Sequence, residues 1–173
     1  YRAVFINVSV SRTDYDCDGV DEVLIHRGDE LTIHFINGTE VIVGRSIVAP
    51  IVTTGIGYSI GNRVYVGSIV IDVDTYSEPH PVNLSSGLAV IYTGSSGIEM
   101  VTENRTKYVL YPVHGSILSV GFKGNDVVVV MNLDKGSFIF SYRLNEGIRY
   151  TSSHTWRINK AICNKLVCFI QVG

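Results

Sequence analysis

Residues 116–143 read SILSVGFKGNDVVVVMNLDKGSFIFSYR, and this stretch decides the fold class. Its apolar runs, Ser116–Phe122, Val127–Asn132 and Ser137–Arg143, are separated by short segments that carry glycine, asparagine or aspartate. Runs of this length, rich in Val, Ile, Phe and Tyr and bounded by such residues, are typical of β-strands. The stretch therefore predicts strands joined by tight turns.

The whole chain shares this composition. Its 173 residues include 25 valines and 19 isoleucines, against 9 leucines and 4 alanines, and 17 glycines are spread along it. β-Branched residues favour strands, and glycine supplies the turns between them. No linker, internal repeat or low-complexity segment stands out. We therefore predict one all-β domain over residues 1–173, an antiparallel β-sandwich of jelly-roll or Greek-key type.

Several local predictions follow from alternation and turn chemistry. Asn37-Gly38 predicts a two-residue type I′ hairpin, and Asn164-Lys165 predicts the turn of a terminal hairpin. Residues 47–60 are compatible with an irregular strand or a loop. A loop is expected over Tyr76–Gly87. Other strands are expected at Tyr1–Val10, Val23–His26, Glu30–Ile36, Glu40–Val43, Arg63–Val73, Leu88–Thr93, Ile98–Thr102 and Lys107–Tyr111.

Charge and hydropathy exclude two classes of partner. Fourteen basic and sixteen acidic residues give a net charge of −2, so no basic field exists to hold nucleic acid. The apolar runs are far shorter than the ~20 residues that span a bilayer. The N-terminus has no leader pattern, so we expect any signal peptide to have been removed from a secreted protein.

The acidic segment Asp14–Glu22 carries the strongest chemical signal. It reads DYDCDGVDE, with carboxylates at Asp14, Asp16 and Asp18, a glycine next, and a fourth carboxylate at Glu22. Ca²⁺ takes 6 to 8 oxygen ligands, and alternate carboxylates followed by glycine can converge on one ion. We predict a Ca²⁺ site with these four side chains, the Val20 carbonyl, and Asp21 as a reserve ligand or a bridge to a neighbour.

The spacing also sets this loop apart from the EF-hand, because the glutamate expected at position 12 is Ile25. The loop resembles the helix-free calcium loops of integrin-type β-propeller repeats and the first half of a dockerin loop. That resemblance implies calcium and nothing more. Asp72 and Asp74 lie two apart near the end of a strand and are candidates for part of a second metal site, or for one exposed strand face.

The cysteines, Cys17, Cys163 and Cys168, lack the spacing of a zinc site. A two-residue turn at Asn164-Lys165 makes Cys163 and Cys168 diagonal neighbours, which is poor geometry for a disulfide, whereas a wider loop pairs them directly. Cys17 bonded to either of them, or three reduced thiols, are the alternatives.

Four N-x-S/T sequons occur, at Asn7, Asn37, Asn83 and Asn104, which favours a secreted, glycosylated protein. The composition, with one Gln and few Met, also favours a hyperthermophilic source. An enzyme is not expected. Gly57–Gly61 matches the G-x-S-x-G nucleophile motif, but a strand rather than a helix is predicted to follow it.

Two functions remain. The strand expected from residue 1 and the neighbouring calcium loop resemble the cannula-type and camelysin-like filament proteins of hyperthermophilic archaea. This resemblance implies a secreted, self-assembling archaeal subunit, with residues 1–10 as a donor strand that completes the sheet of a neighbour. The alternative is a calcium-stabilised carbohydrate-binding or adhesion module, with Tyr150 and Trp156 as a platform for glycans.

Overall fold

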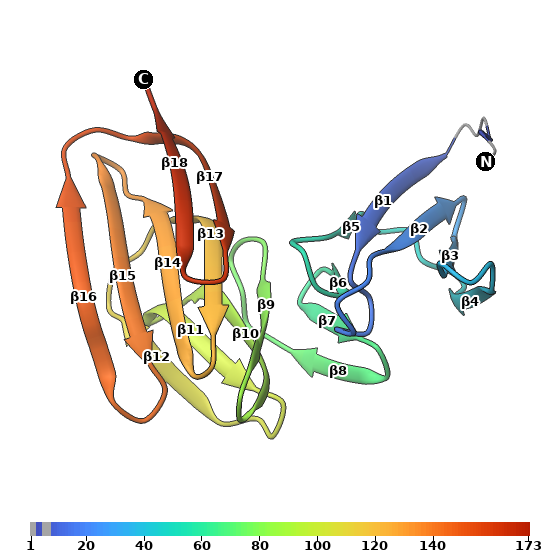
Figure 1. Cartoon of the computed structure of the whole chain (residues 1–173), viewed down its shortest axis with the longest axis horizontal. Coiled ribbons are helices and arrows are strands. Elements are labelled where there is room, and N and C mark those ends of the chain that lie inside the picture. Colours follow the sequence, from blue (N-terminus) through green and yellow to red (C-terminus); the bar gives the residue numbers. More distant parts are fainter. Residues whose placement is uncertain (1–2, 5–7) are drawn as a thin grey trace. The chain divides into compact units, whose positions relative to one another are not determined.

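The computed structural model describes residues 3, 4 and 8–173, and within these residues it contains strands and no helix (Figure 1). The all-β prediction is confirmed. The strands are β1 (Ser9–Thr13), β2 (Glu22–Arg27), β3 (Glu30–His34), β4 (Glu40–Gly44), β5 (Ile51–Val52), β6 (Tyr58–Ile60), β7 (Arg63–Val66), β8 (Ile69–Asp72), β9 (His80–Leu84), β10 (Gly87–Gly94), β11 (Gly97–Thr102), β12 (Lys107–Tyr111), β13 (Ser116–Lys123), β14 (Asp126–Asn132), β15 (Ser137–Arg143), β16 (Gly147–His154), β17 (Ile158–Asn164) and β18 (Val167–Val172). None of the described segments forms a helix long and apolar enough to cross a membrane.

The strands of each sheet are hydrogen-bonded in chain order. Four-stranded sheets form from β1–β4, β5–β8, β9–β12 and β13–β16, and β17–β18 form a two-stranded sheet. This order is a meander, so the described strands make no Greek-key or jelly-roll crossover. The absence of an internal repeat in the sequence stays a prediction.

The chain divides into two compact units, each described here by itself. Unit 1 comprises Tyr1–Gly61 and Tyr65–Ser68, and unit 2 comprises Asn62–Val64 and Ile69–Gly173. A single domain over residues 1–173 stays a prediction.

Unit 2 contains a β-sandwich whose core lies between the sheets β9–β12 and β13–β16. Buried apolar side chains alternate along the strands, as in the pairs Ala89 and Ile91 of β10 and Phe138 and Phe140 of β15. Successive side chains of a strand point to opposite faces, so alternation puts one row into the core. The buried set is Val82, Leu84, Ala89, Ile91, Ile98, Met100, Leu110, Val127, Val129, Met131, Phe138, Phe140 and Leu144.

Unit 1 is built around the sheet β1–β4. Leu24, Leu31 and Ile33 are buried on one face of this sheet and form a core cluster with Tyr58 of β6. The Tyr58 ring stacks on those of Tyr15 and Tyr65, with centroids 6.2 and 4.9 Å apart. Aromatic side chains thus fill the centre of this smaller unit.

The hairpin at Asn37-Gly38 forms, but the predicted type I′ turn is wrong. Gly38 has φ +87°, whereas Asn37 is not among the residues with positive φ. The Gly38 N–H donates to the Phe35 carbonyl, and the Asn37 side chain accepts from the Thr39 N–H. The loop is therefore a three-residue one, in which only the glycine needs the left-handed conformation.

Other boundaries differ from expectation near the N-terminus and the loops. The first described strand is Ser9–Thr13, and Ser9 and Val10 pair with His26 and Ile25 of the same chain. Most of the predicted donor segment, residues 1–10, therefore either lies outside the described residues or pairs within its own chain. The expected loop Tyr76–Gly87 contains β9, so Asn83 lies on a strand.

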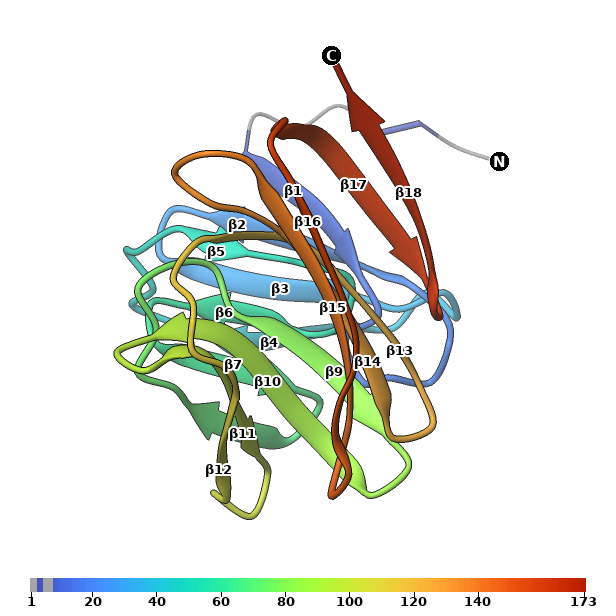
Figure 2. The same cartoon turned by 90° about the vertical axis from the view of Figure 1, so that its left-hand side faces the viewer.

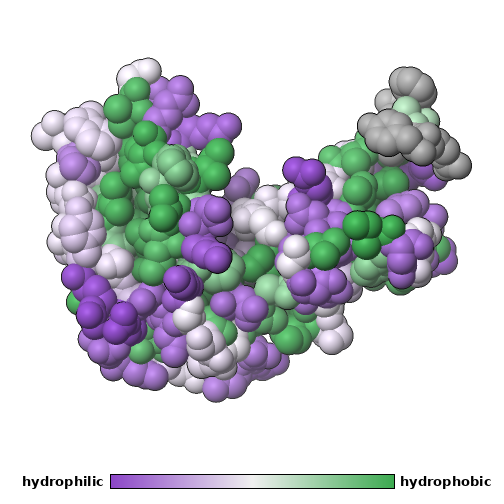
Figure 3. Space-filling model, viewed as in Figure 1, coloured by the Kyte–Doolittle hydropathy of each residue, from purple (hydrophilic) through white to green (hydrophobic). Residues whose placement is uncertain are grey.

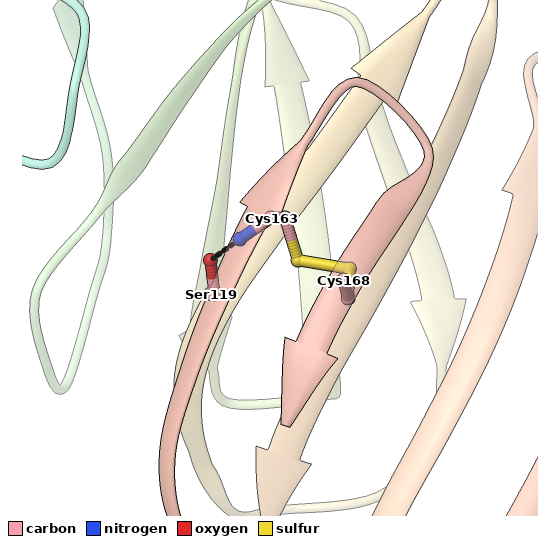
Figure 4. Close-up of a disulfide and its surroundings, with 3 residues drawn as sticks. All are labelled: Ser119, Cys163 and Cys168. Carbon is pink, nitrogen blue, oxygen red and sulfur yellow. Dashed lines mark hydrogen bonds between the residues drawn. A yellow bond between two sulfur atoms is a disulfide. The ribbon is translucent and has the colours of Figure 1, made fainter. Parts of the chain in front are cut away.

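The terminal hairpin β17–β18 carries a disulfide between Cys163 and Cys168, drawn in Figure 4. The two cysteines are directly opposite each other, and Lys165 with φ +54° lies in the turn. The predicted turn was off by one residue, and that shift converts the expected diagonal pair into a facing one. A bridge from Cys17 to either cysteine is therefore wrong. The two strands run antiparallel and end at the C-terminus (Figure 2).

Candidate metal centre

Four carboxylates of the predicted calcium loop lie together in unit 1. One oxygen from each of Asp14, Asp16, Asp18 and Glu22 lies within 4.8 Å of the others. The residues span the connection between β1 and the start of β2. An all-oxygen donor set with several formal negative charges suits a hard cation. The cluster can hold a metal ion.

The loop folds through hydrogen bonds to its own carboxylates. The Asp14 carboxylate accepts from the backbone N–H groups of Asp18 at 3.1 Å and Gly19 at 2.9 Å, and the Asp18 carboxylate accepts from Val20 N–H at 2.9 Å. Cys17 and Gly19 have φ of 62° and 90°, which turn the chain back on itself. Glycine adopts this conformation without a steric cost, so its place in the motif has a structural reason.

Tyr15 attaches the loop to the core of unit 1. Its backbone carbonyl accepts from Gly67 N–H at 2.8 Å, and its hydroxyl donates to the Gly67 carbonyl at 3.0 Å. Its ring packs edge-on against Phe35 and stacks on Tyr58. The Tyr15 side chain thus packs in the core, while its neighbours Asp14 and Asp16 contribute carboxylates to the cluster.

The backbone of Asp14 is held by a second segment. Asp14 N–H donates to the Gly55 carbonyl at 3.1 Å, and Gly57 N–H donates to the Asp14 carbonyl at 2.9 Å. The Thr13 hydroxyl donates to the Gly57 carbonyl. The loop thus rests on residues 55–57 and on Gly67, both distant in sequence.

Glu22 is the buried member of the cluster, with 2% of its surface exposed. Its Oε1 accepts from the Tyr15 N–H at 2.9 Å. Burial raises the pKa of the Glu22 carboxyl, and the negative charges of Asp16, Asp18 and Asp14 raise it further, against the hydrogen bond from Tyr15. Burial also raises the pKa of Asp14, an effect opposed by the N–H groups of Gly19 and Asp18. Burial is the largest cause of both pKa shifts, and neighbouring carboxylates act in the same direction.

Asp21, the reserve ligand predicted for this loop, lies outside the group of converging carboxylates. Asp21 faces the Arg12 guanidinium at 3.4 Å, and both side chains are exposed. Coordination by the Val20 carbonyl stays a prediction.

Asp72 and Asp74 gather no third metal-ligating side chain in the described part of the chain. Asp72 instead accepts a hydrogen bond from Arg63 Nε at 2.8 Å. Both aspartates line a cavity of about 280 Å³ in unit 2, together with Arg105 and Lys107. Asp72 is thus paired with a guanidinium, and a second metal site at Asp72 and Asp74 stays a prediction.

The other residues that the sequence singled out, the serine of the nucleophile motif and the sequon asparagines, lie in separate parts of the fold. Ser59 of the G-x-S-x-G motif is buried in β6, and its hydroxyl donates to the Val52 carbonyl at 3.5 Å. Asn37 and Asn104 lie exposed in turns and Asn83 is exposed on β9, whereas Asn7 lies outside the described residues. Glycosylation of these sequons stays a prediction.

Sequence reasoning missed the residues that support the loop. A Cβ at Gly57, which has φ +58°, would overlap the Tyr65 carbonyl oxygen. One at Gly67 would lie 3.7 Å from Asp16. The glycines were visible in the sequence, but no local pattern links them to residues more than 40 positions away.

Comparison with known proteins adds no relative: no family model, no curated protein and no solved structure matches this chain.

Proposed function

We propose that this chain is a calcium-binding structural protein that is secreted and assembles into an extracellular filament or tube. The observation that carries the calcium proposal is the convergence of Asp14, Asp16, Asp18 and Glu22 within 4.8 Å. Ca²⁺ accepts an irregular set of oxygens at 2.3–2.6 Å, whereas Mg²⁺ demands near-octahedral geometry and keeps several waters. A loop of four protein carboxylates therefore favours Ca²⁺.

Calcium supplies the positive charge that this loop lacks. Without a cation, the carboxylates repel one another, and Glu22 carries its charge in a buried position. The ion is a structural one, because the loop is already attached to the core through Tyr15 and Asp14. Bound Ca²⁺ stabilises the folded state by an amount that grows with its concentration above the dissociation constant.

Thermal unfolding in Ca²⁺, Mg²⁺ and a chelator tests this proposal. Millimolar Ca²⁺ is expected to raise the melting temperature several degrees above the value in chelator, with Mg²⁺ giving a smaller increase. The Asp16→Asn variant should lose most of the calcium effect. Equal melting temperatures in all three solutions would contradict a calcium site.

The disulfide, the sequons and the exposed sheet faces support an extracellular, self-associating protein. Cys163–Cys168 is of the kind that persists in oxidising compartments. Alternation of Val4, Ile6 and Val8 favours a donor segment limited to residues 1–8, since Ser9 and Val10 already pair within the chain.

Electron microscopy and light scattering in calcium test assembly. Filaments or tubes are expected from the whole chain and not from a chain that lacks residues 1–8. A monodisperse monomer of the whole chain at every concentration would contradict the structural function while leaving the calcium site untouched.

A specific surface favours glycan binding as the second candidate function. Trp156 is 43% exposed and stacks on His154 with ring centroids 4.2 Å apart, and the Ser152 hydroxyl contacts the same histidine at 2.8 Å. Tyr150 is exposed on β16, the strand that carries Ser152 and His154. An aromatic face beside hydroxyl groups suits a saccharide. Trp156 fluorescence titrated with a glycan panel tests this candidate, and no shift with any glycan would reject it.

A further inference from the structure

One end of the sandwich of unit 2 carries a polar cavity of about 300 Å³. Its lining comes from three hairpin turns, which join β9 to β10, β11 to β12, and β15 to β16. These turns lie together at the lower end of unit 2 in Figures 1 and 2. Figure 3 shows hydrophilic residues gathered at this end, in contrast to the apolar side chains over β17–β18. Both sheets of the sandwich therefore contribute to the cavity.

Hydrogen bonds between the turns hold this cavity in shape. The side-chain oxygen of Asn125, in the β13–β14 turn, accepts from the N–H and the hydroxyl of Ser86, both at 3.3 Å. The backbone carbonyl of Asn125 accepts from the Leu144 N–H at 3.0 Å. Glu103 Oε1 accepts from the Leu88 N–H at 3.0 Å. Because the contacts of Asn125 cross between the two sheets, the cavity is preformed, as most small-molecule sites are.

The lining carries one charged side chain, and its other polar groups are hydroxyls and amides. The charged residue is Glu103, whose carboxylate already accepts from Leu88. The uncharged polar residues are Ser86, Thr102, Asn104, Thr106, Tyr108 and Asn145. Hydroxyl and amide groups both donate and accept hydrogen bonds, so they match the hydroxyl groups of a neutral sugar. The Tyr108 ring adds an apolar surface on which the C–H face of a sugar ring packs.

A sequon coincides with this cavity. Asn104 is the asparagine of an N-x-T sequon whose threonine is Thr106, and both residues line the cavity. Asn104 Oδ1 accepts from the Thr102 hydroxyl and from the Thr106 N–H, the latter at 3.3 Å. Asn104 Nδ2, the atom that carries an N-linked sugar, donates to no group in the part of the chain that the structure describes. The attachment residue for a sugar and a lining suited to a sugar thus occur at one place.

We propose that this cavity holds one sugar ring, which comes either from an N-linked glycan on Asn104 or from a free saccharide. Its volume lies at the lower end of the range for ligand pockets, about 300–1,000 Å³, which suits a single ring. Attachment joins Nδ2 to the anomeric carbon of a lipid-linked oligosaccharide, with loss of one amide proton and departure of the lipid phosphate. The linked source rests on the secretion in the proposed function, whereas the free source does not.

Unglycosylated protein tests the free source. The chain from the periplasm of a bacterial host without N-glycosylation is titrated with N-acetylglucosamine, glucose and mannose, and amide NMR spectra are recorded. The amides of Leu88 and Thr106 report on the cavity, and the indole N–H of Trp156 reports on the aromatic surface. Asn145→Gly removes a lining amide at φ +70°, which glycine adopts freely. Asn164→Gly is the matched control at an exposed asparagine of β17.

Saturable shifts of the two cavity amides are expected from a saccharide that binds. Asn145→Gly should weaken this binding about fivefold, because one hydrogen bond is lost, and Asn164→Gly should leave it unchanged. Shifts confined to the Trp156 indole would place saccharide binding at the aromatic surface and count against the free source.

Protein from a yeast host tests the linked source. Glycopeptide mass spectrometry gives the occupancy of Asn104 and Asn37, and an endoglycosidase trims each glycan to one N-acetylglucosamine. Asn104→Gln and Asn37→Gln each remove one sugar, and the same variants from the bacterial host correct for the loss of the asparagine itself. Loss of the sugar on Asn104 is expected to lower the melting temperature by about 2–4 °C. Loss of the sugar on Asn37, which is exposed in a turn outside the cavity, should leave it unchanged.

The two arms assign the source of the sugar. Amide shifts in the unglycosylated protein assign a free saccharide, and stabilisation by the sugar on Asn104 assigns the linked glycan. The proposal is overturned if the cavity amides stay unshifted with all three sugars and Asn104 is either unmodified or modified without stabilisation. The calcium and assembly experiments give their own answers in the same preparations, so failure of this site is distinguishable from failure of the proposed function.

Discussion

The buried carboxylate of Glu22 accepts a hydrogen bond from the backbone N–H of Tyr15 at 2.9 Å. This contact joins the last carboxylate of the metal loop to the residue that attaches the loop to the core. The same carboxylate lies beside those of Asp14, Asp16 and Asp18. Glu22 therefore has two opposed effects, since it holds the loop in place and adds a buried negative charge to it.

Glu22→Gln is expected to change stability in opposite directions with and without calcium. The amide oxygen of glutamine still accepts from Tyr15, while the repulsion among the carboxylates falls. In chelator, the variant should be more stable than the wild type by about 1 kcal/mol. In calcium, it should gain less than the wild type. Urea unfolding in both solutions measures the two differences, and equal calcium gains in both proteins would count against a metal at this carboxylate.

Gly57→Ala is expected to destabilise unit 1 strongly. The new Cβ overlaps the Tyr65 carbonyl oxygen and lies 2.8 Å from Val66 Cγ2, at a residue with φ +58°. Gly61→Ala is the matched control, because Gly61 has φ +57° with nothing near its Cβ position. The control should cost about 1 kcal/mol from the backbone conformation alone, and Gly57→Ala clearly more. If both variants lost the same amount of stability in thermal unfolding, Gly57 would not lie this close to the Tyr65 carbonyl oxygen.

Asn132→Leu is expected to loosen β17 from the sandwich. The Asn132 amide donates to the Ile158 carbonyl at 2.8 Å and accepts from its N–H at 2.8 Å, and both bonds are buried. Leucine leaves two backbone groups unsatisfied, at a cost of about 2–4 kcal/mol. Asn164→Leu, at an exposed position of the same hairpin, is the control. Hydrogen exchange of the Ile158 amide reports the local effect, and unchanged protection would refute it.

The buried imidazole of His80 is expected to make the folded protein less stable in acid. Burial lowers the pKa of this imidazole from 6.5 to about 4, and its Nε2 has no hydrogen-bond partner. The unfolded chain therefore binds a proton between these values and the folded chain does not. Stability attributable to His80 is full above pH 6.5 and falls by about 3 kcal/mol as the pH drops to 4.

Urea unfolding of the wild type and of His80→Leu across this range isolates the effect, because the carboxylates titrate alike in both proteins. The difference between the two proteins should change with pH between 6.5 and 4. A constant difference would mean that the imidazole is already accessible to protons in the folded state.

The sequence predicts individual strands better than it predicts how they connect. Lys107–Tyr111 and Ser137–Arg143 have the expected bounds, because alternation and flanking turn residues are local signals. β9 was missed because Pro79 and Pro81 and nearby serines are typical of loops. Tight turns between successive strands favour hairpins, and a run of hairpins gives the meander order. The expectation of a Greek-key or jelly-roll order gave the number and spacing of the strands more weight than these turns.

The sequence predicts the carboxylates of the site, but it does not predict the distant residues that hold the loop in place. Asp14, Asp16, Asp18 and Glu22 lie within nine residues, so loop geometry alone brings them together. The anchoring of Tyr15 by Gly67 crosses more than 50 positions and depends on the fold of unit 1. Cys163 and Cys168 lie opposite each other only because the turn is one residue later than predicted. Turn preferences of the residues did not distinguish the two positions of the turn.

Isothermal titration calorimetry with Ca²⁺ tests the central claim most directly, on the wild type, Asp16→Asn and Asp21→Asn. Both variants remove one acidic charge from the same loop, but only Asp16 belongs to the converging carboxylates, while Asp21 faces Arg12. We predict one calcium ion per chain for the wild type and for Asp21→Asn, and at least tenfold weaker binding for Asp16→Asn. No heat of binding in the wild type, or equal weakening by the two variants, would contradict the account.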